Sequence, residues 1–243
     1  NGLDVIFSDN LKENFDYLII ADGVFSKTRS LVCHENLNLK YNLSLAIRAN
    51  LNGDYGKNIS IFMGSNHHYV IYPVNQNHEY NFVAILNKKL SAEELKNYDL
   101  LKTDRFINSL KFNLSKNSSI KFENLSGIKV FPVFVSNNFS STKNKNIFLS
   151  GDALFAFPPS FAQGASQSIE TAQDIFNSIL TGSNDLYKKR IEKISSINNK
   201  SKLNQFSFHL SNPINVLIRN TILKYLSKNK NFLENYLGKI YRN

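Results

Sequence analysis

Two segments far apart in the chain place an aspartate and a glycine together, directly after a short apolar run: Asp22-Gly23 and Gly151-Asp152. Glycine lets a backbone approach a ligand closely, and an aspartate accepts hydrogen bonds from ribose or ribityl hydroxyls. After the second segment a helix is predicted to begin at Ala165, and the first N–H groups of a helix carry a partial positive charge. Together these groups suit the binding of a dinucleotide.

The elements that must position these groups are two buried strands and one helix. The apolar runs 17–20 and 147–149 predict the strands, because each is short, hydrophobic and followed by turn residues. Each Asp-Gly or Gly-Asp pair is therefore expected at the turn after its strand. In the helix, apolar residues at three- or four-residue spacing predict one apolar face, made of Ile169, Ala172, Phe176 and Ile179.

The first segment, DYLIIADGVFSKTR from Asp16 to Arg29, resembles the DG motif of flavin-dependent aromatic hydroxylases. That motif has an acidic residue, an apolar strand, Ala-Asp-Gly, and then Ser and Arg. Ser26 and Arg29 fall in register with it. Because Asp-Gly alone is a common turn dipeptide, the resemblance depends on the wider match.

The second segment, GDALFAFPPSFAQGASQSIETAQD, resembles the GD motif of the same family. It departs from the family at Phe155, where a histidine is usual, so a role that needs an imidazole is not expected there. The GD motif is matched by Gly151, Asp152, Ala153, Pro159, Gln163 and Gly164. A thinner resemblance to salicylate-hydroxylase-type members covers Tyr72-Pro73, 81–84, Tyr187, Arg190 and 208–220.

This resemblance implies a class A FAD-dependent monooxygenase, similar to salicylate hydroxylase and p-hydroxybenzoate hydroxylase. Such an oxidoreductase uses NADH or NADPH and O2 to hydroxylate a small aromatic substrate, here a phenolic acid, through a C4a-hydroperoxyflavin. A related flavoprotein of other chemistry is the alternative, namely a quinone-pathway hydroxylase, a halogenase or an isoprenoid reductase. The second alternative is a degenerate flavoprotein that does not catalyse a reaction.

The resemblance also implies cofactor-binding roles for individual residues. Asp152 is expected to hold the ribityl chain, and Asp22 and Gly23 to lie near the pyrophosphate or ribose. Backbone N–H groups at the helix start are expected to stabilise negative charge on the flavin ring, and the carbonyl of Pro159 to face the reacting ring. The other residues assigned to the FAD site are Arg29, Gly151, Gly164, Ala165 and Ser166.

His68 and Tyr72 are the candidate catalytic residues of the middle region. They lie four residues apart on an extended segment, so their side chains are expected on the same face. By resemblance they line a substrate pocket, where the histidine assists phenol deprotonation. The alternative is that His67-His68 belongs to an exposed loop. Arg48 is the candidate for binding a substrate carboxylate, and a surface ion pair is its alternative.

The predicted fold is α/β, with a Rossmann-like FAD/NAD(P)-binding domain that is discontinuous in sequence. Residues 1–40 and 141–182 form its two parts, and residues 41–140 form an inserted antiparallel β-sheet substrate domain. Residues 183–243 form a helical C-terminal tail. The family opens with a GxGxxG turn that binds the ADP moiety, and this sequence contains none. We therefore expect an N-terminally truncated fragment that is inactive alone.

The bulk composition argues against several classes of protein. The net charge is +10, but the lysines are scattered among asparagines without a basic stripe, so no nucleic-acid partner is expected. No apolar run is long enough for integral membrane association, and the single Cys33 fits a cytoplasmic location. The five histidines show no metal-ligand spacing, so no metal is expected. A homodimer is left open.

Overall fold

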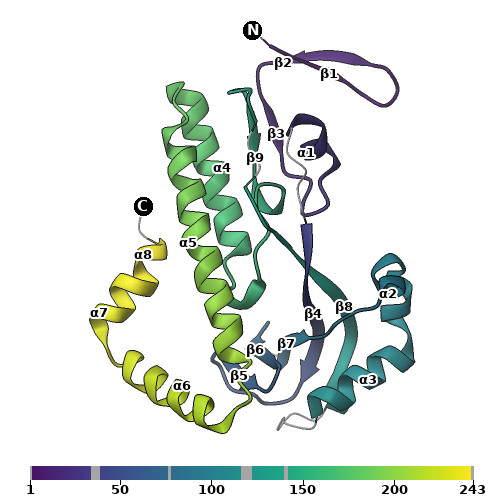
Figure 1. The fold of residues 1–243 in the computed structure, drawn as a ribbon, viewed down its shortest axis with the longest axis vertical. Helices are drawn as coiled ribbons and strands as arrows, with labels where there is room; N and C mark the ends of the chain where they lie inside the picture. The colour runs from purple at the N-terminus through teal and green to yellow at the C-terminus, as the bar shows by residue number, and fades with distance from the viewer. Residues whose placement is uncertain (1, 34–38, 76–77, 116–121, 140–141, 242–243) are drawn as a thin grey trace. The chain divides into compact units, whose positions relative to one another are not determined.

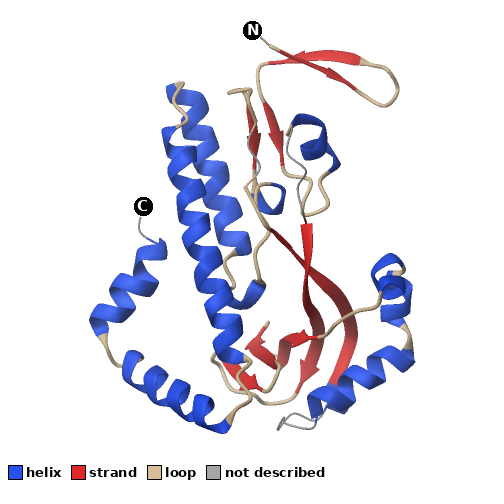
Figure 2. Cartoon of the chain, in the orientation of Figure 1, coloured by secondary structure: helices blue, strands red, loops and turns tan. Residues whose placement is uncertain are grey.

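The computed structural model describes residues 2–33, 39–75, 78–115, 122–139 and 142–241 (Figure 1). The chain divides into two compact units: residues 1–40 with 134–202, and residues 41–133 with 203–243. Both units combine helices and strands, as the colours of Figure 2 show. The division places residues 203–243 with the sheet unit, whereas the sequence analysis treated 183–243 as one helical tail.

The first unit is organised by one pair of parallel strands. β3 (Leu18–Ile20) pairs with β9 (Ile147–Leu149), so that Ile20 lies opposite Leu149. Both residues are buried in the core of this unit. Because the strands are parallel, their carboxyl ends meet at the same edge, and the two turns that carry the aspartates follow from that edge.

Two smaller elements surround this pair in the sequence. β1 (Leu3–Ile6) forms an antiparallel hairpin with β2 (Lys12–Phe15), before β3. After β3, α1 (Lys27–Val32) begins at Ser26, whose Oγ accepts a hydrogen bond from the backbone N–H of Arg29 at 2.9 Å. This serine is an ordinary helix N-cap, so its register in the motif has a structural reason.

After β9 the chain makes two short 3-10 turns, Gly151–Ala153 and Pro159–Phe161. The long helices α4 (Gly164–Thr181) and α5 (Asp185–Phe208) follow. They are held together by Arg190, a buried residue of α5 that forms ion pairs with two carboxylates of α4. These carboxylates belong to Glu170 and Asp174, and Arg190 Nε lies 2.6 Å from Asp174 Oδ2.

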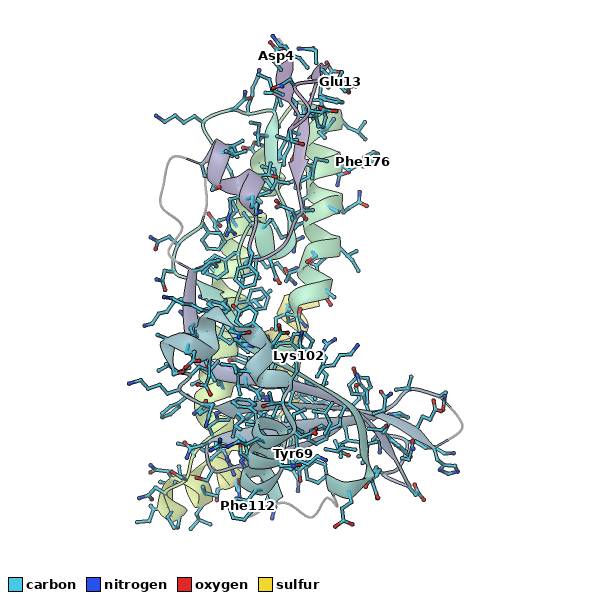
Figure 3. All side chains as sticks on the ribbon, turned by 90° about the vertical axis from the view of Figure 1, so that its right-hand side faces the viewer. Asp4, Glu13, Tyr69, Lys102, Phe112 and Phe176 are labelled. Atoms are coloured by element: carbon cyan, nitrogen blue, oxygen red, sulfur yellow. The ribbon has the colours of Figure 1, made fainter. Side chains whose placement is uncertain are left out.

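The apolar face predicted for α4 is not the face that the helix buries. Ile169 is 72% exposed and Phe176 is 56% exposed, and Phe176 lies on the outer side of α4 in Figure 3. The buried face is mostly polar because Gln167, Glu170 and Asp174 surround Arg190. The predicted helix is confirmed, and the apolar side chains of Ile169 and Phe176 lie on its exposed side. The residues that α4 buries are Gln167, Thr171, Ile175 and Ser178.

The second unit is built on a five-stranded sheet with the order β5-β6-β7-β4-β8. Neighbouring strands from β5 to β4 pair antiparallel, as the sequence predicts. In the register, His68 lies opposite Met63 on one side and Ile85 on the other. The strands are β4 (Leu39–Asn52), β5 (Ser60–Gly64), β6 (His67–Pro73), β7 (Glu79–Asn87) and β8 (Leu125–Ser136).

One face of this sheet carries the core of the second unit, and the labelled Tyr69 of Figure 3 belongs to it. Side chains alternate along a strand, so the intervening positions Arg48, His68 and Tyr72 belong to the opposite face. This placement agrees with the prediction that His68 and Tyr72 share a face. The core includes Leu45, Ile47, Leu51, Tyr69, Ile71, Phe82, Ala84, Leu101, Leu110 and Leu114.

Helical segments between β7 and β8 add Leu101, Leu110 and Leu114 to this core. The first of them begins with the capping box that the sequence indicates, in which Ser91 and Glu94 bond each other's backbone N–H groups. These segments are α2 (Ala92–Lys96), the 3-10 turn Tyr98–Lys102, α3 (Asp104–Ser115) and the 3-10 turn Phe122–Asn124.

The chain ends in helices of the second unit. α6 (Pro213–Leu226) is capped by Asn212, whose Oδ1 accepts from the N–H of Ile214 at 3.0 Å. α7 (Lys230–Phe232), a π-helical turn (Leu233–Leu237) and α8 (Gly238–Tyr241) follow. Within the described residues, no helix combines the length and the apolar character needed to cross a membrane.

Candidate cofactor site and the open sheet face

An open pocket of about 360 Å³ lies in the first unit, at the edge where β3 and β9 end. Both motifs and the start of α4 contribute to its wall. Of the residues predicted for the cofactor site, it brings together Gly23, Gly151, Asp152, Gly164 and Ala165. Ala21, Ser150 and Ser168 also line it and were not predicted. Ser168 was detectable, because it lies four residues after Gly164 and therefore on the same helix face.

The two glycines of the motifs adopt backbone conformations that other residues avoid. Gly23 has φ 87° and Gly151 has φ 59°, in the left-handed region. A Cβ on Gly151 would lie 3.0 Å from Ser168 Oγ, whereas Gly23 faces open space. A side chain at position 151 would therefore be strained and would also press on a pocket residue.

The carboxylate of Asp152 is an exposed acceptor in the wall of this pocket. It accepts no hydrogen bond from the described part of the chain, and partial burial raises the pKa of Asp152. A ligand hydroxyl would satisfy it. Asp22 differs, because its Oδ2 accepts from the Thr28 N–H at 3.3 Å. Partial burial acts to raise the pKa of Asp22, but hydrogen bonds from Ser26 and Thr28 hold it below its usual value.

The start of α4 gives the pocket its positive end. Gln163 precedes the helix without a side-chain cap, so the first N–H groups of α4 are left for water or a ligand. Gly164 and Ala165 line the pocket, and Ser166 does not. A helix terminus of this kind attracts negative charge, as the expected role toward a flavin ring requires.

Arg29 connects the two motifs through backbone carbonyls. Its Nη1 donates to Ala153 O at 2.8 Å and to Asp152 O at 3.3 Å, and its Nη2 donates to Val24 O at 3.0 Å. The side chain is buried. Arg29 is therefore placed to fix the Gly151–Ala153 turn against the Asp22-Gly23 turn, and it acts on the pocket through that turn.

Pro159 and Phe155 lie beyond the pocket wall. Pro159 opens a 3-10 turn in which its carbonyl accepts from the Ala162 N–H at 2.9 Å. Phe155 is buried in the core of the first unit, and its ring stacks on Phe139 with centroids 4.3 Å apart. Phe155 is thus a packing residue of the first unit.

His68 lies on β6 and is only 3% exposed, so the alternative of an exposed loop is wrong. Its Nδ1 lies 2.8 Å from Nε2 of His209, a residue that the sequence analysis did not single out. Burial, with the neighbouring His209 and His67, lowers the pKa of His68 to about 3. Burial and then His67 lower the pKa of His209 to about 4. Both rings are therefore neutral near pH 7.

The other two residues of this sheet face are more accessible. Tyr72 is half-buried, and its hydroxyl accepts a hydrogen bond from Asn81 on the neighbouring strand. Arg48 is exposed opposite Val83 and forms no salt bridge with the residues that the structure describes. His68, Tyr72 and Arg48 all belong to the second unit, whereas the pocket residues belong to the first. No group of three metal-ligand side chains is found among the described residues.

The fold is similar to that of several solved flavoenzymes. Klebsiella pneumoniae HpxO, complexed with FAD and uric acid, matches with a TM-score of 0.71 and 18% identity over 92% of this chain. A salicylate hydroxylase substrate complex matches at 0.65 with 15% identity over 87%. p-Nitrophenol 4-monooxygenase PnpA from Pseudomonas putida DLL-E4 matches at 0.66 with 13% identity over 99%.

These matches concern the fold. The chain spans about three fifths of each of those proteins: 59% of HpxO, 59% of the salicylate hydroxylase and 62% of PnpA. No protein-family model matches the sequence, and no curated protein matches it. The chain therefore has the mixed α/β fold of FAD-dependent monooxygenases, with an antiparallel sheet and a helical C-terminal part.

Proposed function

We propose that this chain is part of an FAD-dependent monooxygenase that hydroxylates a small aromatic compound bearing a phenol group. The observation that carries the proposal is the parallel pairing of β3 with β9. It gathers Gly23, Gly151, Asp152 and the start of α4 around one pocket. The similarity in fold to HpxO, which was crystallised with FAD, supports the same cofactor.

The residues of the pocket fit the cofactor chemically. The free carboxylate of Asp152 would accept a ribityl hydroxyl, and the N–H groups at the start of α4 would face the electron-rich edge of the flavin ring. Because Gly151 has no side chain, a ligand could approach its backbone closely. Bound FAD would supply the oxidative chemistry, with NADH or NADPH as electron donor and O2 as oxidant.

The sheet face that carries Arg48, His68 and Tyr72 would bind the aromatic substrate. The exposed guanidinium of Arg48 suits a carboxylate, and the Tyr72 hydroxyl is held by Asn81. His68 is neutral, and its low pKa makes it a poor acceptor of a whole proton near neutral pH. We therefore assign to His68 the task of accepting a hydrogen bond from the substrate hydroxyl, which orients the ring.

Asp152→Ala tests the cofactor site directly. Because a hydrogen bond to a charged group contributes about 1.5–3 kcal/mol, we expect FAD to bind roughly 10- to 100-fold more weakly. The measurement is a titration followed by quenching of flavin fluorescence. Asp185→Ala, an exposed aspartate at the start of α5, is the matched control and should bind FAD as the unmodified chain does. Equal affinities for the two variants would remove Asp152 from the site.

Catalysis is tested on the longest form of the protein that its gene encodes. With FAD bound, oxidation of NADH or NADPH should accelerate when a hydroxybenzoate is added. FAD binding without stimulation by any phenolic acid would favour a related flavoprotein of other chemistry. Failure of the full-length protein to bind FAD would contradict the proposal itself.

A further inference from the structure

Three polar side chains form one continuous hydrogen-bonded row in the second unit. Asn87 ends β7, His209 follows the last residue of α5, and His68 lies on β6. Asn87 Oδ1 lies 2.9 Å from His209 Nδ1, and His209 Nε2 lies 2.8 Å from His68 Nδ1. The row therefore connects three elements that are distant in sequence.

The end of α5 is fixed to the strand ends by further bonds. The His209 carbonyl accepts from the Asn66 N–H at 3.2 Å, and the Asn66 carbonyl accepts from the Asn87 N–H at 2.8 Å. Asn42 Nδ2 donates to Gln205 Oε1 at 3.0 Å. These contacts hold the His209 ring in place, so the geometry of the row does not depend on one side chain alone.

The positions of the protons follow from the chemistry of each group. The carbonyl oxygen of Asn87 only accepts, so His209 Nδ1 must carry a proton. A neutral ring with a proton on Nδ1 has a lone pair on Nε2. His68 Nδ1 must then donate to that lone pair, and the remaining nitrogen of His68, Nε2, is unprotonated.

The free nitrogen of His68 is available to an outside donor. Among the described residues, His68 Nε2 forms no hydrogen bond, and it is not one of the fully enclosed side-chain atoms without a partner. The ring is otherwise buried, with Phe208 packed edge-on at 5.2 Å between centroids. An acceptor in such dry surroundings favours a ligand that brings an N–H or O–H group.

We propose that His209 and Asn87 are positioning residues that fix the tautomer of His68, so that His68 Nε2 presents a lone pair to the substrate. A site built in this way selects a ring that carries a free hydroxyl and rejects the corresponding ether or phenolate. The selection of substrate rests on the proposed function. The fixed tautomer does not, because it follows from the hydrogen bonds of the chain itself.

Nitrogen NMR of the unmodified chain tests the tautomer without cofactor or turnover. In protein labelled with 15N-histidine, we expect the rings of His68 and His209 both to carry their proton on Nδ1 at pH 7. Single replacements of the histidines assign the signals, and His78→Gln, at an exposed position, is the control that leaves the others unchanged. A proton on Nε2 of His68 would overturn the proposal.

Two variants test whether the hydrogen bonds from Asn87 through His209 fix the tautomer of His68. Asn87→Asp places a carboxylate beside His209 Nδ1 and favours the doubly protonated ring, which would donate from Nε2 and move the His68 proton to Nε2. His209→Phe removes the acceptor, so the His68 tautomers should become mixed. Far-ultraviolet circular dichroism identifies a variant that fails to fold. The tautomer of His68 in the other, folded variant then decides whether the row fixes it. An unchanged His68 tautomer in a folded variant would contradict the positioning role.

The predicted preference for a ring with a free hydroxyl is tested by comparing the binding of a hydroxybenzoate and of its methoxy analogue to the FAD-loaded full-length protein. We expect the hydroxy compound to bind at least about tenfold more tightly, since a site with a buried acceptor rejects the analogue that lacks the donor. In His209→Phe the ratio should fall toward one. If the tautomer is as expected but neither compound binds, the proposed function fails while the positioning role of His209 and Asn87 stands.

Discussion

The pocket of the first unit and the sheet face of the second unit that carries Arg48, His68 and Tyr72 are built in different ways. The pocket depends on backbone: two glycines with positive φ, a helix start, and a parallel pair of strands. The sheet face depends on side chains, which meet only when α5 ends beside β6 and β7. A backbone site leaves a sequence motif, whereas a side-chain row assembled by tertiary contacts does not.

The largest expected effect concerns the scaffold of the first unit. Arg190→Met removes the buried cation between Glu170 and Asp174; Glu170 keeps Lys193 at 2.9 Å, whereas Asp174 is left without an ion pair among the described residues. We expect a loss of roughly 3–5 kcal/mol in the free energy of unfolding. Urea denaturation is the measurement, and Lys188→Ala, an exposed partner of Asp185 at 3.9 Å, is the control, with a change below about 1 kcal/mol. A small loss for Arg190→Met would show that the helix pair does not depend on the ion cluster.

The second prediction concerns the sheet face and its dependence on pH. In the folded chain the pKa values of His68 and His209 are lowered to about 3 and about 4, whereas in the unfolded chain both histidines take up protons near pH 6.5. Between those values the unfolded state binds more protons, so stability falls as the pH is lowered from 7 to 5. The slope approaches about 1.4 kcal/mol per pH unit for each histidine.

Urea denaturation at pH 7, 6 and 5 measures this slope. In the double variant His68→Phe with His209→Phe, the dependence should be flatter, because two of the three buried histidine rings no longer titrate on unfolding; burial also lowers the pKa of His67, which keeps its part of the slope. His78→Gln should keep the slope of the unmodified chain. A slope that is unchanged in the double variant would place the pH sensitivity elsewhere in the molecule.

The smallest expected effect tests whether the pocket depends on the left-handed backbone conformation of Gly151. Gly151→Ala introduces a Cβ at φ 59° and 3.0 Å from Ser168 Oγ. We expect a loss of about 1–2 kcal/mol in stability and weaker FAD binding. Gly164→Ala is the matched control for stability, because no atom lies within 4 Å of its Cβ position and its φ is not in the left-handed region. Equal stabilities would mean that the turn at Gly151 adapts to a side chain.

Local signals in the sequence were sufficient for the elements with local causes. The strands predicted before the two motifs are confirmed, and the capping box of Ser91 and Glu94 and the cap at Asn212 also have local causes. Each depends on residues within a few positions of one another. For the same reason the sequence indicates the antiparallel sheet, whose alternation is visible strand by strand.

Other features depend on contacts that no local pattern contains. The buried face of α4 is mostly polar because Arg190 of α5 packs against it. His209 meets His68 across 141 positions, and Arg29 meets Ala153 across 124. All the cofactor, catalytic and substrate roles assigned to individual residues stay predictions.

The pairing of β3 with β9 has a consequence for how the chain is made. β3 leaves the ribosome before the sheet of the second unit, and its partner β9 follows only after that sheet. Long-range parallel pairing is slow to form, and domains are completed as the chain emerges. The cofactor pocket is therefore among the last features to assemble, and translation that stops before Leu149 yields a chain with a sheet but no place for the cofactor.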